Sequence, residues 1–169
     1  MTSDQQLYSW FRMVDIDNSG EVDVSELQQA LGQARMNFSL HACAMLIRMY
    51  DSKRSSTVNF NEFVGLHKFI LSVQQSFARF DLDRNGGLDF GEVLQALQFN
   101  GFVLDMPAYQ SAFAAFDPEK KGVLRMDDYI QLAAYLSASR SMFNAFDPQR
   151  TGAIHVNFSQ FVYVTAHLR

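Results

Sequence analysis

The chain has 169 residues, of which 48% are apolar and 19% are charged, and its formal net charge is −4. This composition predicts one globular domain, excludes wholesale disorder and argues against nucleic-acid binding. The single cysteine, Cys43, excludes an internal disulfide framework, and we expect neither a signal peptide nor a membrane span of ~20 apolar residues. We therefore expect a cytoplasmic protein that is recruited to membranes only indirectly, through partners.

Five aspartates each open a similar short polar stretch, at Asp15, Asp51, Asp81, Asp117 and Asp147. Their spacing of 36, 30, 36 and 30 residues indicates an internal repeat with an alternating period. Twelve-residue windows that start at these aspartates hold 16 of the 18 acidic residues; they cover 15–26, 51–62, 81–92, 117–128 and 147–158. Carboxylates concentrated in short glycine-containing loops are typical of sites for hard cations.

Apolar residues flank each window at helical spacing, so each loop should join two amphipathic helices. The shorter intervals predict one shared helix at 63–80 and another at 129–146, whereas the longer intervals have room for two helices with linkers at 37–39 and 101–107. The eighth residue of every window is β-branched or leucine, which suits a short strand that pairs two loops. The sequence thus predicts an all-α array of eight helices in one domain, 1–169, with loops one and two paired, loops three and four paired, and loop five unpaired.

The first and third windows match the calcium loop of a helix–loop–helix motif at every ligand position. In the first, we expect side-chain oxygens from Asp15, Asp17 and Ser19, the carbonyl of Glu21, a water held by Asp23 and both carboxylate oxygens of Glu26. In the third, the same roles fall to Asp81, Asp83, Asn85, the carbonyl of Gly87, Asp89 through water, and Glu92. The prediction is two Ca²⁺ ions per chain, with Mg²⁺ as an alternative occupant at rest.

The other three windows lack parts of this pattern, and we expect them to be structural. Lys53 occupies a ligand position in the second window, and Lys121 occupies one in the fourth. The fourth window also closes with Asp128, whose side chain is too short to chelate, and the fifth closes with Phe158. An ammonium group at a ligand position repels a cation, and a phenyl ring offers it no oxygen.

Five hands at this spacing, with two shared helices, resemble the penta-EF-hand family over nearly the whole chain. The intact first loop and the segments S-E-L-Q-Q-A-L at 25–31 and N-F-N-E-F at 59–63 are most similar to its apoptosis-linked adaptor branch. The resemblance implies a calcium-dependent adaptor that dimerises through the fifth hand and binds Pro-rich segments of target proteins. The chain departs from that branch at His67 and Val73, where tryptophans that help to form a peptide groove are typical.

The leading hypothesis is a calcium sensor and adaptor that exposes apolar surface when Ca²⁺ fills the first and third loops. One alternative is the regulatory small subunit of a calpain-like cysteine protease, in which the fifth hand forms a heterodimer rather than a homodimer. Another is a cytosolic calcium buffer whose helices barely move. Four scattered histidines and the absence of a nucleophile or phosphate motif predict that the protein is not an enzyme.

Overall fold

The computed structural model describes residues 4–167, so residues 1–3 and 168–169 of the predicted domain lie outside the described part. Within it, the helices are α1 Asp4–Val14, α2 Val24–Gln33, α3 Leu40–Arg48, α4 Phe60–Phe80, α5 Phe90–Phe99, α6 Met106–Phe116, α7 Met126–Phe146 and α8 Phe158–His167. The strands are β1 Glu21–Val22, β2 Val58–Asn59, β3 Leu88–Asp89 and β4 Val123–Leu124. The predicted all-α fold of eight helices is confirmed, and α4 and α7 are the two shared helices.

The helices that leave the first three loops begin with the same hydrogen-bonded cap. The ninth loop residue accepts the backbone N–H of the twelfth, and the carboxylate of the twelfth accepts the backbone N–H of the ninth. The pairs are Asp23 with Glu26, Asn59 with Glu62, and Asp89 with Glu92. Glu26 and Glu92, which are predicted to chelate a metal, therefore also stabilise the first turns of the helices that follow them. Glu62, at the same position of loop two, has the same capping role.

The strands pair as the sequence predicts, loop one with loop two and loop three with loop four. Val22 lies opposite Val58, and Leu88 lies opposite Leu124. All four side chains are completely buried, which explains the apolar eighth position of each window. Ile154, the corresponding residue of the fifth loop, lies in no strand.

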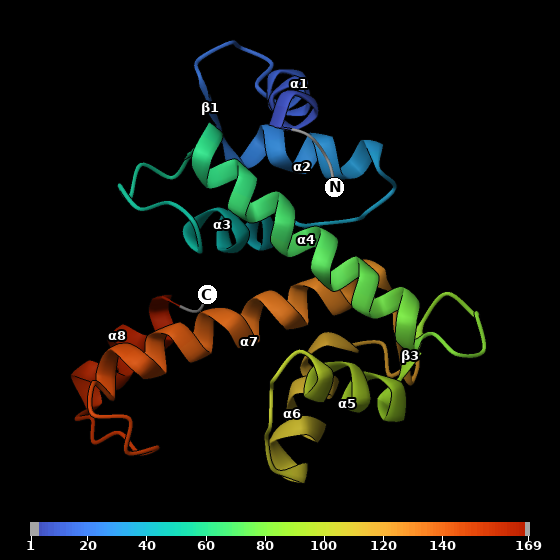
Figure 1. Cartoon of the computed structure of the whole chain (residues 1–169). Helices are drawn as coiled ribbons and strands as arrows, with labels where there is room; N and C mark the ends of the chain where they lie inside the picture. The colour runs from blue at the N-terminus through green and yellow to red at the C-terminus, as the bar shows by residue number, and fades with distance from the viewer. Residues whose placement is uncertain (1–3, 168–169) are drawn as a thin grey trace.

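The long helices α4 and α7 contact each other at the centre of the molecule (Figure 1). Helices α1 to α3 lie on one side of this contact, and α5 and α6 lie on the other. One hydrophobic core runs through both halves and includes Leu46, Leu66, Leu97 and Leu132. No helix among the described residues combines the length and the hydropathy needed to cross a bilayer.

Three polar side chains form a small network inside this core. The Ser76 and Tyr129 hydroxyls lie 3.2 Å apart, and the Asn100 side-chain amide donates to both, at 2.9 and 3.1 Å. Ser76 is on α4, Tyr129 is on α7 and Asn100 caps the end of α5. Because buried polar groups are costly unless they are paired, this network fixes how α5 meets the two long helices.

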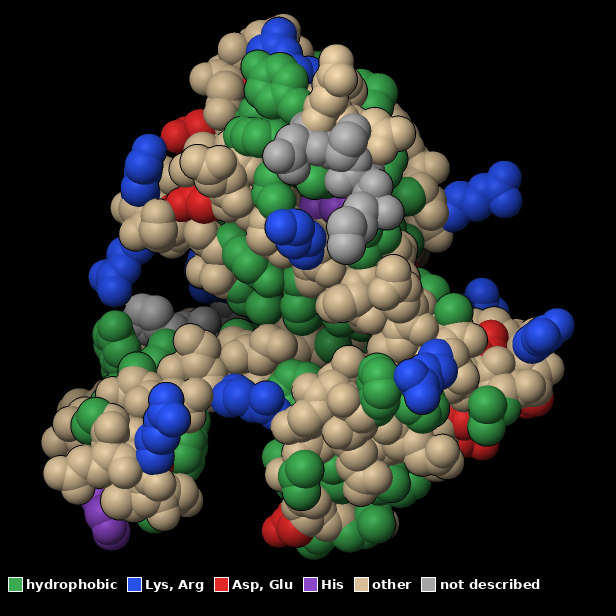
Figure 2. Space-filling model, in the orientation of Figure 1, with side chains coloured by type: hydrophobic (Ala, Val, Ile, Leu, Met, Phe, Trp, Pro, Cys, Tyr) green, Lys and Arg blue, Asp and Glu red, His purple; other side chains and the backbone are tan. Residues whose placement is uncertain are grey.

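The fifth hand is attached mainly through α7 and leaves apolar side chains in solvent. Phe158 is 81% exposed and Phe161 is 54% exposed, and Val162 and Tyr163 are about half exposed. In the space-filling view, the end of α7 and α8 project as an arm, separated by a hollow from α5 and α6 (Figure 2). This face is therefore largely open to solvent in the single chain.

The buried network predicts a stability effect that is independent of metal. We expect Tyr129→Phe to lower the free energy of unfolding by about 1–2 kcal/mol, because it leaves Ser76 and Asn100 without their shared partner. Urea unfolding in chelator measures the change. The matched variant Tyr135→Phe, at a half-buried tyrosine that packs on Phe116, should change stability by less than about 0.5 kcal/mol; equal losses in the two variants would contradict the role of the network.

Candidate metal centre

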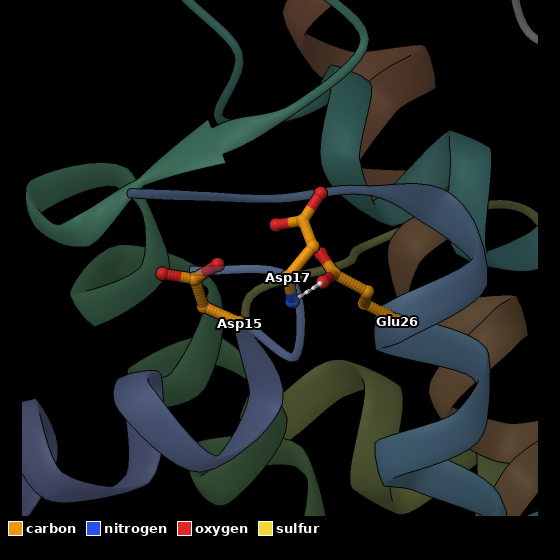
Figure 3. Close-up of side chains that lie close together, drawn as sticks. All are labelled: Asp15, Asp17 and Glu26. Carbon is orange, nitrogen blue, oxygen red and sulfur yellow. Dashed lines mark hydrogen bonds between the residues drawn. The ribbon is translucent and has the colours of Figure 1, made fainter. Parts of the chain in front are cut away.

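Three of the five carboxylates of loop one lie close together between α1 and α2 (Figure 3). Asp15, Asp17 and Glu26 each place an oxygen so that the three atoms lie within 4.8 Å of one another. Asp15 is only 1% exposed and Glu26 is buried, so two of the three charges are withdrawn from water. Like charges held this close inside a protein favour a cation between them, and oxygen ligands are those that Ca²⁺ prefers.

Hydrogen bonds from the backbone hold Glu26 in place. Its Oε1 accepts the N–H of Ile16 at 2.9 Å and that of Asp17 at 3.4 Å, and its Oε2 accepts the N–H of Asp23 at 2.9 Å. The carboxylate thus joins the entering side of the loop to the first turn of α2. Asp23, expected to act through water, is the N-cap and accepts from Glu26 at 2.8 Å.

The remaining predicted ligands of loop one also turn toward its interior. The Ser19 hydroxyl donates to the carbonyl of Glu21 at 2.9 Å, so both groups already face each other. Hydrogen bonding from Ser19 lowers the pKa of Asp17, which keeps that carboxylate ionised near neutral pH. The Arg12 guanidinium, which the sequence did not single out, lies 3.8 Å from Asp15 and partly offsets the negative charge.

Loop three has the same frame, but its carboxylates are arranged differently. Glu92 accepts the N–H of Leu82 at 3.1 Å and that of Asp89 at 3.0 Å. Asp81 Oδ1 is buried without a hydrogen-bond partner, which is the kind of unsatisfied acceptor that a bound cation would pair. Asp83, by contrast, accepts the side-chain amide of Asn85 at 2.7 Å, so these two predicted ligands face each other. Gly87, predicted to offer its carbonyl, donates its N–H to Asn85 Oδ1 at 2.8 Å.

In loop two, N–H and hydroxyl groups of the loop itself donate hydrogen bonds to both carboxylates. Asp51 accepts the N–H groups of Lys53, Ser55 and Ser56 at 2.7–3.1 Å. Glu62 accepts both the N–H and the hydroxyl of Ser52, at 3.0 and 2.6 Å, and the hydroxyl bond lowers the pKa of Glu62. The loop is thus closed by the chain's own donors.

In loop four, a lysine side chain forms an ion pair with one of the loop's own carboxylates. The Lys121 ammonium lies 2.5 Å from the carboxylate of Glu119, which occupies the third position of the loop. Asp128 accepts the N–H of Arg125 at 3.2 Å, and burial raises the pKa of its carboxyl group, with repulsion from Asp127 adding to the effect. These contacts support the interpretation of loop four as structural.

The fifth loop ends two residues later than the window 147–158. Asn157 caps α8 and Gln160 is its partner, since the N–H of each donates to the side-chain oxygen of the other at 2.9 Å. Gln160 therefore holds the place that Glu26 holds in loop one, and Phe158 is the first residue of the helix. The error arose because a fixed length of twelve was assumed, although the Asn–x–x–Gln spacing of a capping box was present in the sequence.

The two glutamates Glu26 and Glu62 allow a matched test of the metal sites. We expect Glu26→Gln to reduce the calcium stoichiometry from two ions per chain to one, because a neutral amide cannot chelate with two charged oxygens. Glu62→Gln removes a carboxylate with a similar hydrogen-bonding role and should leave two. Calorimetric titration gives both numbers; an unchanged stoichiometry in Glu26→Gln would place the ion elsewhere.

Comparisons with known proteins agree with this arrangement. A family model described as an EF-hand domain pair matches residues 4–67 and 72–134. Peflin of Homo sapiens is 32% identical over 165 residues, which are 96% of this chain and 58% of that protein. The chain thus spans little more than half the length of this relative.

Two further proteins match over a larger share of their own length. Penta-EF hand domain-containing protein 2 of Dictyostelium discoideum is 30% identical over 161 residues, 95% of this chain and 78% of that protein. The solved structure of a homolog of programmed cell death 6 protein from Leishmania major Friedlin is 36% identical, with a TM-score of 0.71 over 98% of this chain and 95% of the other. This chain's five related loops join eight helices within residues 4–167, and the chain belongs to the penta-EF-hand family of calcium-binding proteins.

Proposed function

We propose that the protein is a calcium sensor that binds target proteins through an apolar pocket beside loop one. The observation that carries the proposal is that Glu26, the closing residue of the loop, also lines this pocket. The pocket has a volume of about 480 Å³ and lies between α1, α2 and α4; its walls include Trp10, Met13, Leu27, Ala30, Phe63, Leu66 and Ile70. Metal site and pocket thus share one side chain.

This shared side chain gives a physical route from metal to pocket. A bound Ca²⁺ would supply the positive charge that the three carboxylates of loop one lack. Glu26 would give up hydrogen bonds to backbone N–H groups in order to bind the ion. Because Glu26 lies in the first turn of α2, this change would act on the start of that helix. Leu27 and Ala30 follow it on that helix, so a shift of the first turn changes the pocket wall.

The chemistry of the wall suits a Pro-rich segment. The rings of Trp10 and His67 lie 5.0 Å apart, and Trp10 is partly exposed at the rim. Burial lowers the pKa of His67, so its imidazole is neutral near neutral pH and presents an aromatic face. Pro-rich peptides dock in grooves lined by aromatic side chains. Val73, the second departure from the adaptor branch, lies in the core and does not line this pocket.

The sensor acts, in this proposal, as a non-enzymatic adaptor in the cytoplasm that reaches membranes through its partners. Mg²⁺ is the alternative occupant of the calcium sites at rest. A calcium buffer and a calpain-like regulatory subunit are the competing functions, and each predicts a different outcome in the two tests that follow.

Trp10 is the only tryptophan of the chain and reports directly on the pocket. We expect calcium to change the emission of Trp10, and a short Pro-rich peptide to change it further only when calcium is present. Glu26→Gln should abolish the calcium response, whereas Glu92→Gln, at the third loop, should retain it. Calcium binding with unaltered Trp10 emission would favour a buffer.

The exposed apolar face of the fifth hand supports dimerisation through that hand, because loops one to four are already paired within the chain. We expect Phe161→Asp to shift the protein from dimer to monomer in sedimentation velocity, since a carboxylate would be buried in the interface. Trp10→Phe, on the opposite half of the molecule, is the control and should remain a dimer. A monomeric parent protein that pairs only with a protease chain would favour the regulatory-subunit function.

A further inference from the structure

Loops one and two are joined by a side-chain contact as well as by their strands. The Thr57 hydroxyl of loop two donates to the Glu21 carboxylate of loop one. The Ser55 hydroxyl lies 2.8 Å from that of Thr57 and 3.3 Å from Asp51 Oδ1; because the Thr57 proton points to Glu21, only Ser55 can donate in the contact between the two hydroxyls. The result is a chain of hydroxyls that ends on a charged acceptor, an arrangement in which successive hydrogen bonds strengthen one another.

The chain of hydroxyls is itself anchored in the closed frame of loop two. The backbone N–H of Ser55 donates to Asp51 at 3.0 Å. The strand register pairs Glu21 directly with Asn59, so Thr57, two residues before Asn59, lies on the same face of the strand pair and diagonal to Glu21, within reach of its long side chain. Glu21 is therefore held from a loop that needs no metal to keep its shape.

Glu21 is the seventh residue of loop one, where the predicted ligand is the main-chain carbonyl. That carbonyl already faces the loop interior, since it accepts the Ser19 hydroxyl at 2.9 Å. Fixing the Glu21 side chain restricts the backbone dihedrals on both sides of the carbonyl. A ligand that is fixed before binding loses less conformational entropy when the ion arrives, so the site binds more tightly.

Loops three and four provide an internal comparison that lacks this contact. The seventh residues there are Gly87 and Val123, and a Cβ added to Gly87 would lie 3.3 Å from Cβ of Val123. The positions match in space, but neither side chain can donate or accept a hydrogen bond. Loop one also differs in that three of its carboxylates lie close together, whereas among the described residues those of loop three form no such group.

We infer that Thr57, on a loop without metal, is a positioning residue that preorganises loop one, so that loop one fills with calcium before loop three. The inference rests on the proposed calcium sites and adds the order in which they fill. It also assigns a role in affinity to loop two beyond that of a strand partner.

Two glycine amides allow each site to be followed separately. The N–H of Gly20 donates to Asp15 at 3.1 Å, and that of Gly86 donates to Asp81 at 3.2 Å. Their NMR signals therefore report the occupancy of loops one and three during one calcium titration. In the parent protein we expect the Gly20 signal to reach its midpoint at the lower calcium concentration.

Variants at position 57 test the contact directly. Thr57→Val keeps the shape but removes the hydroxyl, and we expect the Gly20 midpoint to rise roughly three- to tenfold while the Gly86 midpoint stays unchanged. Thr57→Ser keeps the hydroxyl and should restore the parent value. Val123→Thr places a hydroxyl at the matching position of loop four, where Gly87 offers no carboxylate, and should move neither midpoint.

The outcomes separate the two proposals. If both midpoints rise equally in Thr57→Val, or if Thr57→Ser fails to restore the first, Thr57 acts on general stability and the inference is overturned. Unchanged midpoints in Thr57→Val also overturn it while leaving the calcium sites intact. If neither glycine responds to calcium in the parent protein, the proposed function fails as well.

Discussion

One hydrogen bond recurs in all five loops, and the shape of each loop depends on it. The carboxylate of the first aspartate accepts the N–H of the sixth residue, at distances of 2.7–3.2 Å. This bond requires the chain to reverse within five residues, and the sixth residue is left-handed in every loop, with φ from +64° to +86°. Four of these residues are glycines, which adopt such angles freely, and the fifth is Ser56. A charge-assisted bond of about 1.5–3 kcal/mol is enough to hold a serine there.

Because the frame is built from the chain's own donors, a loop can lose its metal ligands and keep its form. Loop two keeps the turn with Ser56, and loop four keeps it beside the Lys121–Glu119 ion pair. Each then supplies the strand that its partner loop needs, since Val58 and Leu124 bury Val22 and Leu88. Loops two and four thus serve as the other half of a pairing unit whether or not they hold metal, and loop five, which pairs with no other loop among the described residues, carries the exposed apolar face.

The spacing of aspartates predicted the helices well, because loop length and helix length together set the period. It could not reveal contacts between residues that only the packing brings together, such as Trp10 with His67 or Ser76 with Tyr129. The contact of Thr57 with Glu21 could not be predicted from the sequence either, because the seventh position of a calcium loop is expected to contribute only its backbone carbonyl. Three candidate ligands of loop one, Asp15, Asp17 and Glu26, lie close together, whereas the hydrogen bond from Asn85 to Asp83 in loop three depends on side-chain rotamers that no sequence pattern encodes.

The way each loop closes explains why the two pairs of hands differ. In loops one to three, the glutamate at the twelfth position is long enough to reach the N–H of the second residue, Ile16, Ser52 or Leu82, at 2.9–3.1 Å. Loops four and five have Pro118 and Pro148 at the second position, which have no N–H to offer, and they close with the shorter Asp128 and the neutral Gln160. Loop one is therefore paired with loop two, in which Glu62 bonds to the N–H of Ser52 at the other end of the loop. Loop three is paired with loop four, which lacks this hydrogen bond because Pro118 has no N–H. On the inference drawn above, this asymmetry favours preorganisation of loop one over loop three, and it is loop one whose glutamate borders the pocket.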